Sequence, residues 1–272
     1  NAAEGIGLFR SEFLYMDSET VPTEEEQFES YKVVVEKMQG KPVIIRTLDV
    51  GGDKEIKSIS LEKEANPFLG YRAIRICLDD VALFKTQLRA LLRASHFGNL
   101  AIMLPMISSI DELRAAKRII KDVENELDQK GIPYKRDIKV GIMIEIPAAA
   151  LIADHLAKEC DFFSIGTNDL IQYTTAVERG NEKIAKLYTK YHPGVIKLIK
   201  FAIDGAHKNG IFCGMCGEAA GEFSMNPSKI LKARKSVCEA NFEECKKLAE
   251  EILSMASATE VEKRLKEYGN TK

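Results

Sequence analysis

The sequence lacks an excess of either charge and lacks a long apolar run, and both features exclude classes of protein. Its 39 basic and 41 acidic residues give a net charge of −2 without a strongly basic block, which argues against nucleic acid as the main partner. No apolar run is long enough to span a membrane, and the first residues do not resemble a secretory signal. We therefore expect a cytoplasmic protein that binds neither membrane nor nucleic acid.

Cysteine and histidine are sparse and form no regular pattern. The six cysteines are scattered through 272 residues, a length that needs no disulfide framework, which favours a reducing compartment. Cys213 and Cys216 have C-x-x-C spacing, but a zinc ribbon needs a second pair at a suitable distance, which Cys238 and Cys245 do not supply. The four histidines show no metal-ligand spacing, and His192 alone is expected near the site because it precedes a proline.

Hydrophobic residues make up 45% of the chain, and apolar strand-like runs alternate with helical patterns. We predict strands at residues 5–13, 43–49, 68–76, 100–106, 139–145, 162–165, 211–216 and 222–225. The third prediction is the weakest because Arg72 and Arg75 interrupt the apolar run. Helices are predicted to begin after Thr23 and Ser109, each followed three residues later by a glutamate as in a capping box. Further helices are predicted at 79–96, 148–158 and 193–209.

Repeated strand–helix units favour an α/β fold with a parallel sheet closed as a (β/α)8 TIM barrel, and an open doubly wound sheet is the alternative. Residues 217–221 are all that separates the seventh predicted strand from the eighth, which leaves no room for a helix. Either one crossover helix is absent there, or a stretch is missing from the sequence. We treat residues 1–272 as a single domain.

Acidic residues stand at the ends of two successive apolar runs. Glu145 closes one run just before Pro147, and Asp169 follows the run that ends at Gly166. Charged residues are rarely buried unless they are paired or bound to metal. Two carboxylates on neighbouring strand ends therefore indicate a site for a hard cation such as Mg²⁺.

Basic residues also gather at the predicted strand ends. Arginine binds carboxylates and phosphates through two parallel hydrogen bonds and stays charged when buried. One such arginine is usually a structural ion pair, but four beside two acids suit a polyanion bridged by a cation. The four are Arg10, Arg46, Arg72 and Arg179. Lys54 follows a Gly-Gly turn, which is a weak signal, and for Cys216 a proton donor and a buried core thiol remain equal alternatives.

At these residues the chain resembles the C-terminal, phosphoenolpyruvate-binding domain of enzyme I of the bacterial sugar phosphotransferase system. The matching motifs run through most of the chain in the family's order. They are 4–14 (EGIGLFRSEFL), 46–54 (RTLDVGGDK), 66–75 (NPFLGYRAIR), 163–170 (FSIGTNDL) and 214–218 (GMCGE). Pyruvate phosphate dikinase and phosphoenolpyruvate synthase share several motifs, but residues 49–54 and 172–181 resemble enzyme I more closely.

The resemblance implies a role for each residue of the candidate site. Glu145 and Asp169 would hold Mg²⁺, and Cys216 would protonate the enolate of pyruvate at its methylene carbon. The phosphate and carboxylate of phosphoenolpyruvate would be bound by Arg10, Arg46, Arg72, Asn168 and Arg179, with Lys54 nearby.

The resemblance also implies partners. The family transfers the phosphoryl group to a histidine on a separate N-terminal domain, which then passes it to the phosphocarrier protein HPr, and its C-terminal domain forms a homodimer. That histidine lies in a Gly-rich Thr-Ser-His context, which none of the four histidines here has. We therefore expect the phosphohistidine domain to be absent from this chain.

Two other functions remain as alternatives. A Mg²⁺-dependent enolate lyase or aldolase would use the same two acids with pyruvate enolate but would not need four arginines directed at phosphate. A non-catalytic sensing and dimerisation module would not need the thiol of Cys216. Dependence of binding on phosphate, and exchange of the substrate's methylene protons, distinguish these alternatives.

Overall fold

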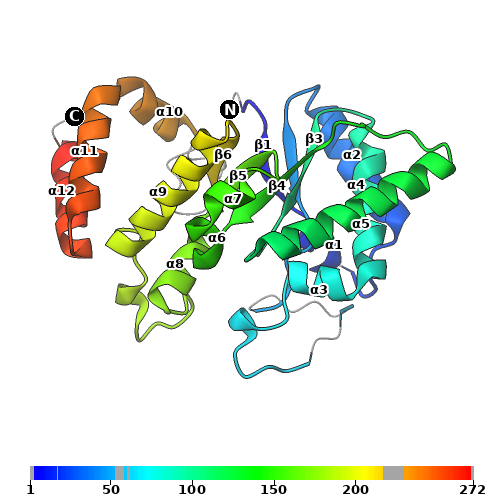
Figure 1. Ribbon diagram of the computed structural model, residues 1–272, viewed down its shortest axis with the longest axis horizontal. Helices are drawn as coiled ribbons and strands as arrows, with labels where there is room; N and C mark the ends of the chain where they lie inside the picture. The colour runs from blue at the N-terminus through cyan, green and yellow to red at the C-terminus, as the bar shows by residue number, and fades with distance from the viewer. Residues whose placement is uncertain (1–2, 17, 53–57, 60–61, 217–229, 271–272) are drawn as a thin grey trace.

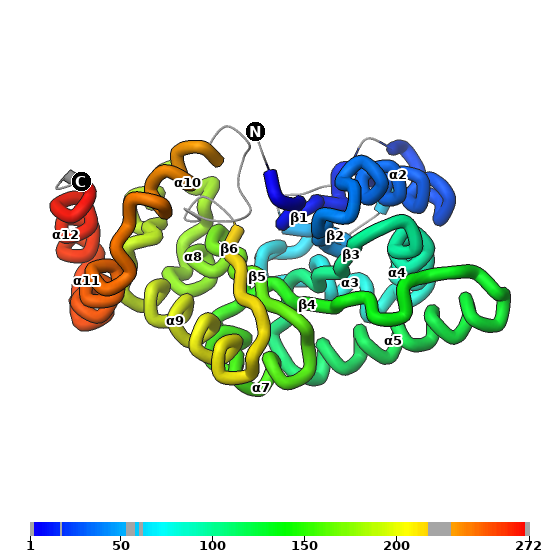
Figure 2. Tube along the Cα trace, turned by 90° about the horizontal axis from the view of Figure 1, so that it is seen from above, coloured from blue at the N-terminus to red at the C-terminus, as the bar shows by residue number. Residues whose placement is uncertain are grey.

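One curled sheet of six parallel strands organises the protein (Figures 1 and 2). The computed structural model describes residues 3–16, 18–52, 58–59, 62–216 and 230–270. The strands lie side by side in chain order: β1 (Ile6–Arg10), β2 (Val43–Arg46), β3 (Leu100–Leu104), β4 (Lys139–Ile144), β5 (Phe162–Gly166) and β6 (Phe212–Cys216). Residues of the edge strands β1 and β6 approach to within 8 Å between Cα atoms. The described part of the chain is therefore an α/β half-barrel.

Alternation along each strand separates the outer core from an inner face. Ile45 and Ile102 point outward into the main core beneath the helices, whereas Met103 and Met143 form a second cluster with Phe162 on the inner face. The same alternation turns polar residues at the carboxyl ends of the strands inward. The inner face thus becomes polar where the parallel strands end, which is where (β/α)8 enzymes place their sites.

Two predicted capping boxes are confirmed. The hydroxyl of Thr23 accepts a hydrogen bond from the Glu26 backbone N–H at 3.3 Å, and the Glu26 carboxylate accepts one from the Thr23 N–H at 2.8 Å. They begin α2 (Glu24–Lys37). Ser109 and Glu112 pair in the same way at the start of α5 (Ile110–Gln129). Each box satisfies backbone donors that a helix N-terminus leaves free.

The remaining helices cover the two flanks of the sheet. In Figure 1, α2, α4 and α5 lie toward the right, and α6 to α9 lie toward the centre and left. Their bounds are α1 (Glu12–Met16), α3 (Ile74–Asp79), α4 (Val81–Ser95), α6 (Pro147–Leu151), α7 (Ala153–Leu156), α8 (Thr167–Thr175), α9 (Pro193–Lys208), α10 (Ile230–Glu239), α11 (Phe242–Ser254) and α12 (Ala258–Asn270), with short 3₁₀ turns η1 (Pro67–Leu69) and η2 (Ala185–Leu187).

Two parts of the predicted barrel differ from the structure or lie outside it. Residues 68–76 are not a strand, because η1 ends at Leu69 and α3 begins at Ile74. Between them Ala73 has a φ of 51°, which no extended strand permits. The predicted strand 222–225 and the short connection 217–221 lie outside the described residues. The helix predicted at 148–158 is divided at Ile152 into α6 and α7.

The C-terminal helices form a small cluster of their own at the left of Figure 1. Leu248 and Ile252 of α11 pack against Val261 of α12, and Met255 joins them. Phe242, the first residue of α11, is outside this cluster and is 77% exposed. None of the helices in the described ranges is both long and apolar enough to cross a membrane.

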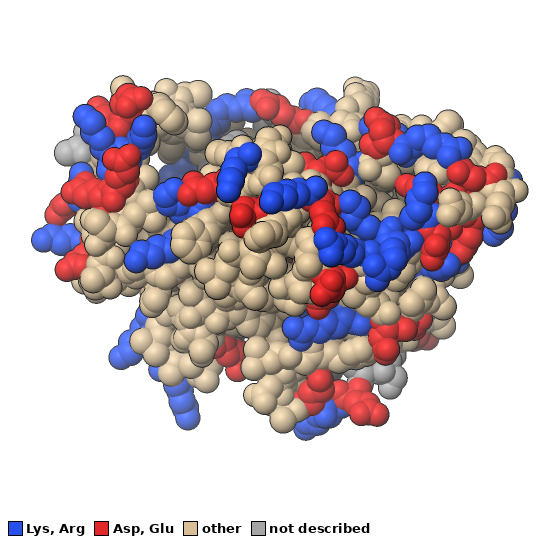
Figure 3. All heavy atoms as spheres, viewed as in Figure 1, with Lys and Arg blue, Asp and Glu red and all other residues tan. Residues whose placement is uncertain are grey.

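Charges of both signs are interspersed on the molecular face shown in Figure 3, in keeping with the low net charge. Arg89 and Arg93 of α4 pair with Glu24 of α2 at 2.6 and 2.7 Å, and Arg89 also meets Glu126 of α5. These partly exposed ion pairs connect three neighbouring helices. Such pairs contribute little individually, so we assign them a structural role.

Candidate functional site

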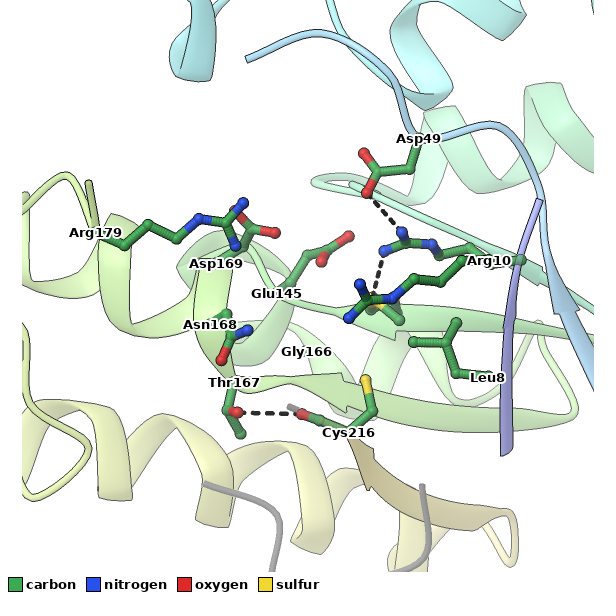
Figure 4. A pocket seen from close by; sticks show the side chains of 12 residues that line it. Leu8, Arg10, Asp49, Glu145, Gly166, Thr167, Asn168, Asp169, Arg179 and Cys216 are labelled. Atoms are coloured by element: carbon green, nitrogen blue, oxygen red, sulfur yellow. Dashed lines mark hydrogen bonds and ion pairs between the residues drawn. The ribbon is translucent and has the colours of Figure 1, made fainter. Parts of the chain in front are cut away.

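A pocket lies at the carboxyl ends of the strands, on the inner face of the sheet (Figure 4). It contains about 470 Å³ of space free of atoms, part of it open to solvent. Its lining combines arginine, carboxylate, amide and thiol groups with two apolar side chains. The lining residues are Leu8, Arg10, Arg46, Asp49, Met143, Glu145, Gly166, Thr167, Asn168, Asp169, Arg179 and Cys216.

One side of the pocket is held by buried arginine–carboxylate pairs, which we call the arginine wall (Glu12, Arg46, Asp49 and Arg72). Arg46 Nη2 lies 2.6 Å from Glu12 Oε1 and 2.9 Å from Asp49 Oδ2, and Arg46 Nη1 donates to Met143 Sδ at 3.6 Å. The second carboxylate oxygen of Asp49 pairs with Arg72 Nη2 at 3.1 Å. Burial lowers the pKa of Arg46 and of Arg72, whereas the nearby carboxylates raise it by a larger amount. Both guanidinium groups therefore stay charged.

Arg72 is the fully buried member of this wall and does not line the pocket itself. Its Nη1 donates to the Tyr173 hydroxyl at 3.0 Å, and Tyr173 in turn donates to the carbonyl of Phe68. Gly51 has a φ of 95°, and a Cβ there would lie 2.6 Å from the Arg72 Cβ. The Gly-Gly turn is therefore needed for close packing against the segment that carries Arg72.

The opposite side of the pocket carries Glu145 and Asp169, which we call the acid wall. Glu145 is buried, and its Oε1 accepts a hydrogen bond from the Met106 N–H at 2.7 Å. Met106 has a φ of 56°, a conformation that costs a non-glycine residue energy and is often retained at functional sites. A Cβ at position 166 would lie 2.8 Å from Glu145 Oε2, so Gly166 leaves room for this carboxylate.

The two carboxyl groups of the acid wall repel each other. The pKa of Glu145 is raised to about 8. Burial raises it most, repulsion from Asp169 and Asp49 raises it too, and attraction to Arg46 and Arg72 lowers it. Asp169, in the first turn of α8, is 8% exposed, and within the described chain its Oδ1 receives no hydrogen bond. Arg72 Nη1 lies 3.6 Å from the same oxygen.

These two carboxylates fit a Mg²⁺ ion that completes its coordination with other oxygens. The described ranges contain no group of three or more acidic, histidine or cysteine ligands. Mg²⁺ is typically held by one or two carboxylates and takes its remaining ligands from water and substrate phosphates. The buried oxygen of Asp169 that lacks a donor, and the repulsion that raises the pKa of Glu145, both suit a cation between them.

Cys216 ends β6 on the same inner face. Its thiol is directed toward the pocket in Figure 4, and its carbonyl accepts a hydrogen bond from the Thr167 hydroxyl at 3.1 Å. Burial raises the pKa of this thiol, although a hydrogen bond with Ser164 lowers it, so the thiol is protonated at neutral pH. Cys213 packs toward the outer core, and neither cysteine forms a disulfide with another described residue. The two thiols of the C-x-x-C spacing therefore lie on opposite sides of β6.

The structure brings most of the predicted residues to one pocket. Arg10, Arg46, Asn168 and Arg179 line it together with the two acids and the thiol, whereas Lys54 lies outside the described residues. His192 is not in the pocket: its Nδ1 accepts a hydrogen bond from the Gly194 N–H at 3.1 Å and caps α9.

Sequence reasoning missed the carboxylates that hold the arginines. Asp49 is the last residue of the strand predicted at 43–49, and that position alone suggested no role for it. Glu12 had no recognisable signal, because its pairing with Arg46 depends on contact between β2 and the segment after β1. Leu8 and Met143 also line the pocket and looked like ordinary strand residues.

Comparison with known proteins agrees with this geometry. Residues 1–242 match the family described as PEP-utilising enzyme, PEP-binding domain, where PEP is phosphoenolpyruvate. The chain belongs to this family. The matched range includes every residue that lines the pocket and ends at the start of α11.

Two relatives of this PEP-binding domain are phosphoenolpyruvate-protein phosphotransferases. The protein from Priestia megaterium is 53% identical over 96% of this chain, and that from Bacillus subtilis is 50% identical over 98%. The chain spans about half the length of these relatives, 48% and 49% respectively. The resemblance to the enzyme I family found from the motifs is thereby confirmed.

A solved structure supports the fold of the PEP-binding domain independently. A citrate lyase from Burkholderia xenovorans LB400 superposes with a TM-score of 0.51, covering 93% of this chain and 82% of the lyase chain. The two sequences are 16% identical, so the likeness concerns the fold alone.

Proposed function

We propose that this domain binds phosphoenolpyruvate together with Mg²⁺ and supports transfer of its phosphoryl group to a protein histidine, releasing pyruvate. This would be the first step of the sugar phosphotransferase system. The observation that carries the proposal is one pocket lined by three arginines, an asparagine, three carboxylates of which Glu145 and Asp169 repel each other, and a protonated thiol. Phosphoenolpyruvate offers a phosphate, a carboxylate and a methylene carbon to match these groups.

The arginines and Asn168 would bind and orient the substrate. Arg10, Arg46 and Arg179 line the pocket and supply charge for the phosphate and carboxylate, while Arg72 fixes Asp49 from behind. Mg²⁺, held by Glu145 and Asp169, would neutralise charge on the phosphoryl and enolate oxygens. Phosphoryl transfer depends mainly on such positioning and charge neutralisation.

Cys216 would complete the reaction by protonating the carbon. Departure of the phosphoryl group leaves an enolate, whose methylene carbon takes the thiol proton to form the methyl group of pyruvate. The S–H bond breaks as the C–H bond forms, and the resulting thiolate recovers a proton from water. A thiol whose pKa is raised by burial holds its proton until the enolate is present.

The wider arrangement follows from the same proposal. Residues 1–272 would act as one substrate-binding and dimerisation domain in the cytoplasm, working with an N-terminal phosphohistidine domain and, through it, with HPr. The curl of the parallel sheet, whose edge strands β1 and β6 approach each other, supports a barrel-like architecture for this domain. Pyruvate phosphate dikinase and phosphoenolpyruvate synthase remain the alternative members of the family.

Calorimetric titration with phosphoenolpyruvate, with and without Mg²⁺, tests the proposal. We expect Mg²⁺-dependent binding that Arg46→Ala and Asp169→Ala each weaken roughly 10- to 100-fold, the size of a lost charge-assisted interaction. Arg114→Ala is the control, because Arg114 pairs with Glu159 at 2.6 Å on the exposed surface. Absence of binding by the unaltered chain in Mg²⁺, or equal binding of pyruvate and phosphoenolpyruvate, would contradict the proposal.

A further inference from the structure

A buried polar network lies beneath α1 and outside the pocket. Its members come from α1, α2, α4 and the residue that follows β1, and each is at most 1% exposed. They are Ser11, Tyr15, Gln27, Tyr31 and Gln87. Burying a polar group costs free energy unless the group forms hydrogen bonds. A connected set of this size in an apolar core therefore requires a physical reason.

Gln87 of α4 is the member that touches both segments behind the arginine wall. Its Nε2 donates to the Ser11 hydroxyl at 3.0 Å and to the Tyr31 hydroxyl at 3.1 Å, and its Oε1 accepts from the Leu48 N–H at 2.8 Å. One amide thus joins the chain after β1 to the chain after β2. Both segments are distant in sequence from α4.

Two hydrogen-bond partners of Gln87, Ser11 and Leu48, each directly precede a carboxylate residue of the arginine wall. Glu12 follows Ser11 and lies 2.6 Å from Arg46 Nη2, and Asp49 follows Leu48 and lies 2.9 Å from the same nitrogen. The separation of these two carboxylates therefore depends on one side chain that bridges their neighbours. A shift in either carboxylate would move the guanidinium of Arg46, which lines the pocket.

We propose that Gln87 is a positioning residue for substrate binding, setting the place of Arg46 through the Ser11–Glu12 and Leu48–Asp49 segments. The proposal rests on the proposed function, in which Arg46 binds an oxyanion of phosphoenolpyruvate. Gln87 itself does not touch the pocket. Displacing a binding group by a fraction of an ångström is enough to weaken recognition of a planar or tetrahedral anion.

The first test compares two variants that disturb the same network. Gln87→Met keeps the length of the side chain and removes both bridging hydrogen bonds, whereas Tyr31→Phe removes a hydroxyl and leaves the Ser11–Gln87–Leu48 bridge intact. With Mg²⁺ present and well below the unfolding temperature, we expect Gln87→Met to weaken phosphoenolpyruvate binding about tenfold. Tyr31→Phe should leave the affinity within about twofold while lowering the melting temperature. Equal loss of affinity in both variants would overturn the proposal.

A double-mutant cycle separates positioning of Arg46 from a general loss of stability. Arg46→Lys keeps the charge but cannot form the paired contacts of the guanidinium. If Gln87 acts through Arg46, adding Gln87→Met to Arg46→Lys should weaken binding by less than about twofold. A full tenfold loss in the Arg46→Lys background means that Gln87 acts by another route, and the proposal fails.

A measurement without substrate keeps this proposal separate from the proposed function. Nitrogen NMR of the arginine side chains should show hindered rotation of the Arg46 guanidinium in the unaltered chain and in Tyr31→Phe, and freer rotation in Gln87→Met. Unchanged rotation in Gln87→Met overturns the positioning role whether or not phosphoenolpyruvate binds. Failure of the unaltered chain to bind phosphoenolpyruvate, with the expected rotation pattern, overturns the substrate assignment instead.

Discussion

The two walls of the pocket contain the same kinds of charged group and differ in how those groups are paired. In the arginine wall, Arg46 and Arg72 meet carboxylate oxygens of Glu12 and Asp49 at 2.6 to 3.1 Å. In the acid wall, Glu145 is held by a backbone N–H, and the guanidinium recorded near Asp169 is 3.6 Å away. The first wall is held by short ion pairs, whereas the described contacts of the second are a backbone hydrogen bond and one longer ion pair.

This difference shows which part of the site is complete before any ligand arrives. Buried charges are tolerated when they are paired and hydrogen-bonded, as in the arginine wall. The acid wall instead has a carboxyl whose pKa is raised to about 8 and a carboxylate oxygen without a donor in the described chain. We infer that the arginine wall is a rigid template, whereas the acid wall gains its stability from a bound cation.

Breaking the arginine wall should have the largest effect on stability. Asp49→Ala leaves two buried arginines without their shared carboxylate, and we expect a loss of about 3–5 kcal/mol in the free energy of unfolding. Urea titration measures this loss. The control is Glu159→Ala, which removes the partner of exposed Arg114 and should cost at most about 1 kcal/mol. Similar losses for the two variants would mean that the arginine wall is not pre-assembled.

Removing the thiol beside the acid wall should affect chemistry rather than binding. Cys216→Ala deletes the proposed proton donor, so exchange of the methyl protons of pyruvate with deuterated water, with Mg²⁺ present, should slow about a hundredfold or more. Proton NMR follows the exchange. The matched control is Cys213→Ala, three residues earlier on the outer side of β6, which should exchange at the normal rate. Normal exchange in Cys216→Ala would assign the proton to another group.

The acid wall should make the metal-free chain less stable as the pH rises. Because the pKa of Glu145 is raised from 4.5 to about 8, the folded state binds more protons than the unfolded state between these values. Stability should then fall with rising pH across this window, by at most about 1.4 kcal/mol per pH unit for one group.

Melting temperatures measured from pH 4.5 to 9 test this dependence. Glu145→Gln should remove the slope, and Mg²⁺ should oppose it at the alkaline end because the ion favours the ionised carboxylates. A slope that persists in Glu145→Gln would place the titrating group elsewhere.

Local patterns in the sequence were sufficient to predict most of the scaffold. Capping boxes at Thr23 and Ser109 depend on neighbours three residues apart, and apolar runs predicted each of the six described strands. Residues 68–76 were predicted wrongly because their conformation is set from a distance. The contacts of Arg72 with Asp49 and Tyr173, and the positive φ of Ala73, leave no periodic signal in the sequence.

The same distinction applies to the site. Glu145, Asp169 and Arg46 were found because a charge in or after an apolar strand is unusual in any sequence. Glu12 and Gln87 are distinguished only by what they contact across the fold. Sequence reasoning thus found most of the charged groups that line the pocket and missed the contacts that hold them in place.

Tyr173 connects the two walls, and its removal should give the smallest effect. From α8 of the acid wall, its hydroxyl donates to the Phe68 carbonyl and accepts from Arg72 Nη1 at 3.0 Å. Tyr173→Phe should cost about 1 kcal/mol in unfolding free energy, the net value of a typical hydrogen bond. It should also weaken Mg²⁺-dependent phosphoenolpyruvate binding a few-fold, because the hydrogen bond between Arg72 and α8 is lost.

The control for Tyr173 is a second tyrosine that spans neither wall. Tyr71 donates its hydroxyl to Asp79 at 2.6 Å near the surface, so Tyr71→Phe removes a hydrogen bond of comparable geometry without touching Arg72 through its side chain. Calorimetry should then find weaker ligand binding for Tyr173→Phe alone. If both variants bind phosphoenolpyruvate with the affinity of the unaltered chain, the two walls are positioned independently of each other. The difference between the walls then reflects how their charges are paired and not a hydrogen bond that joins them.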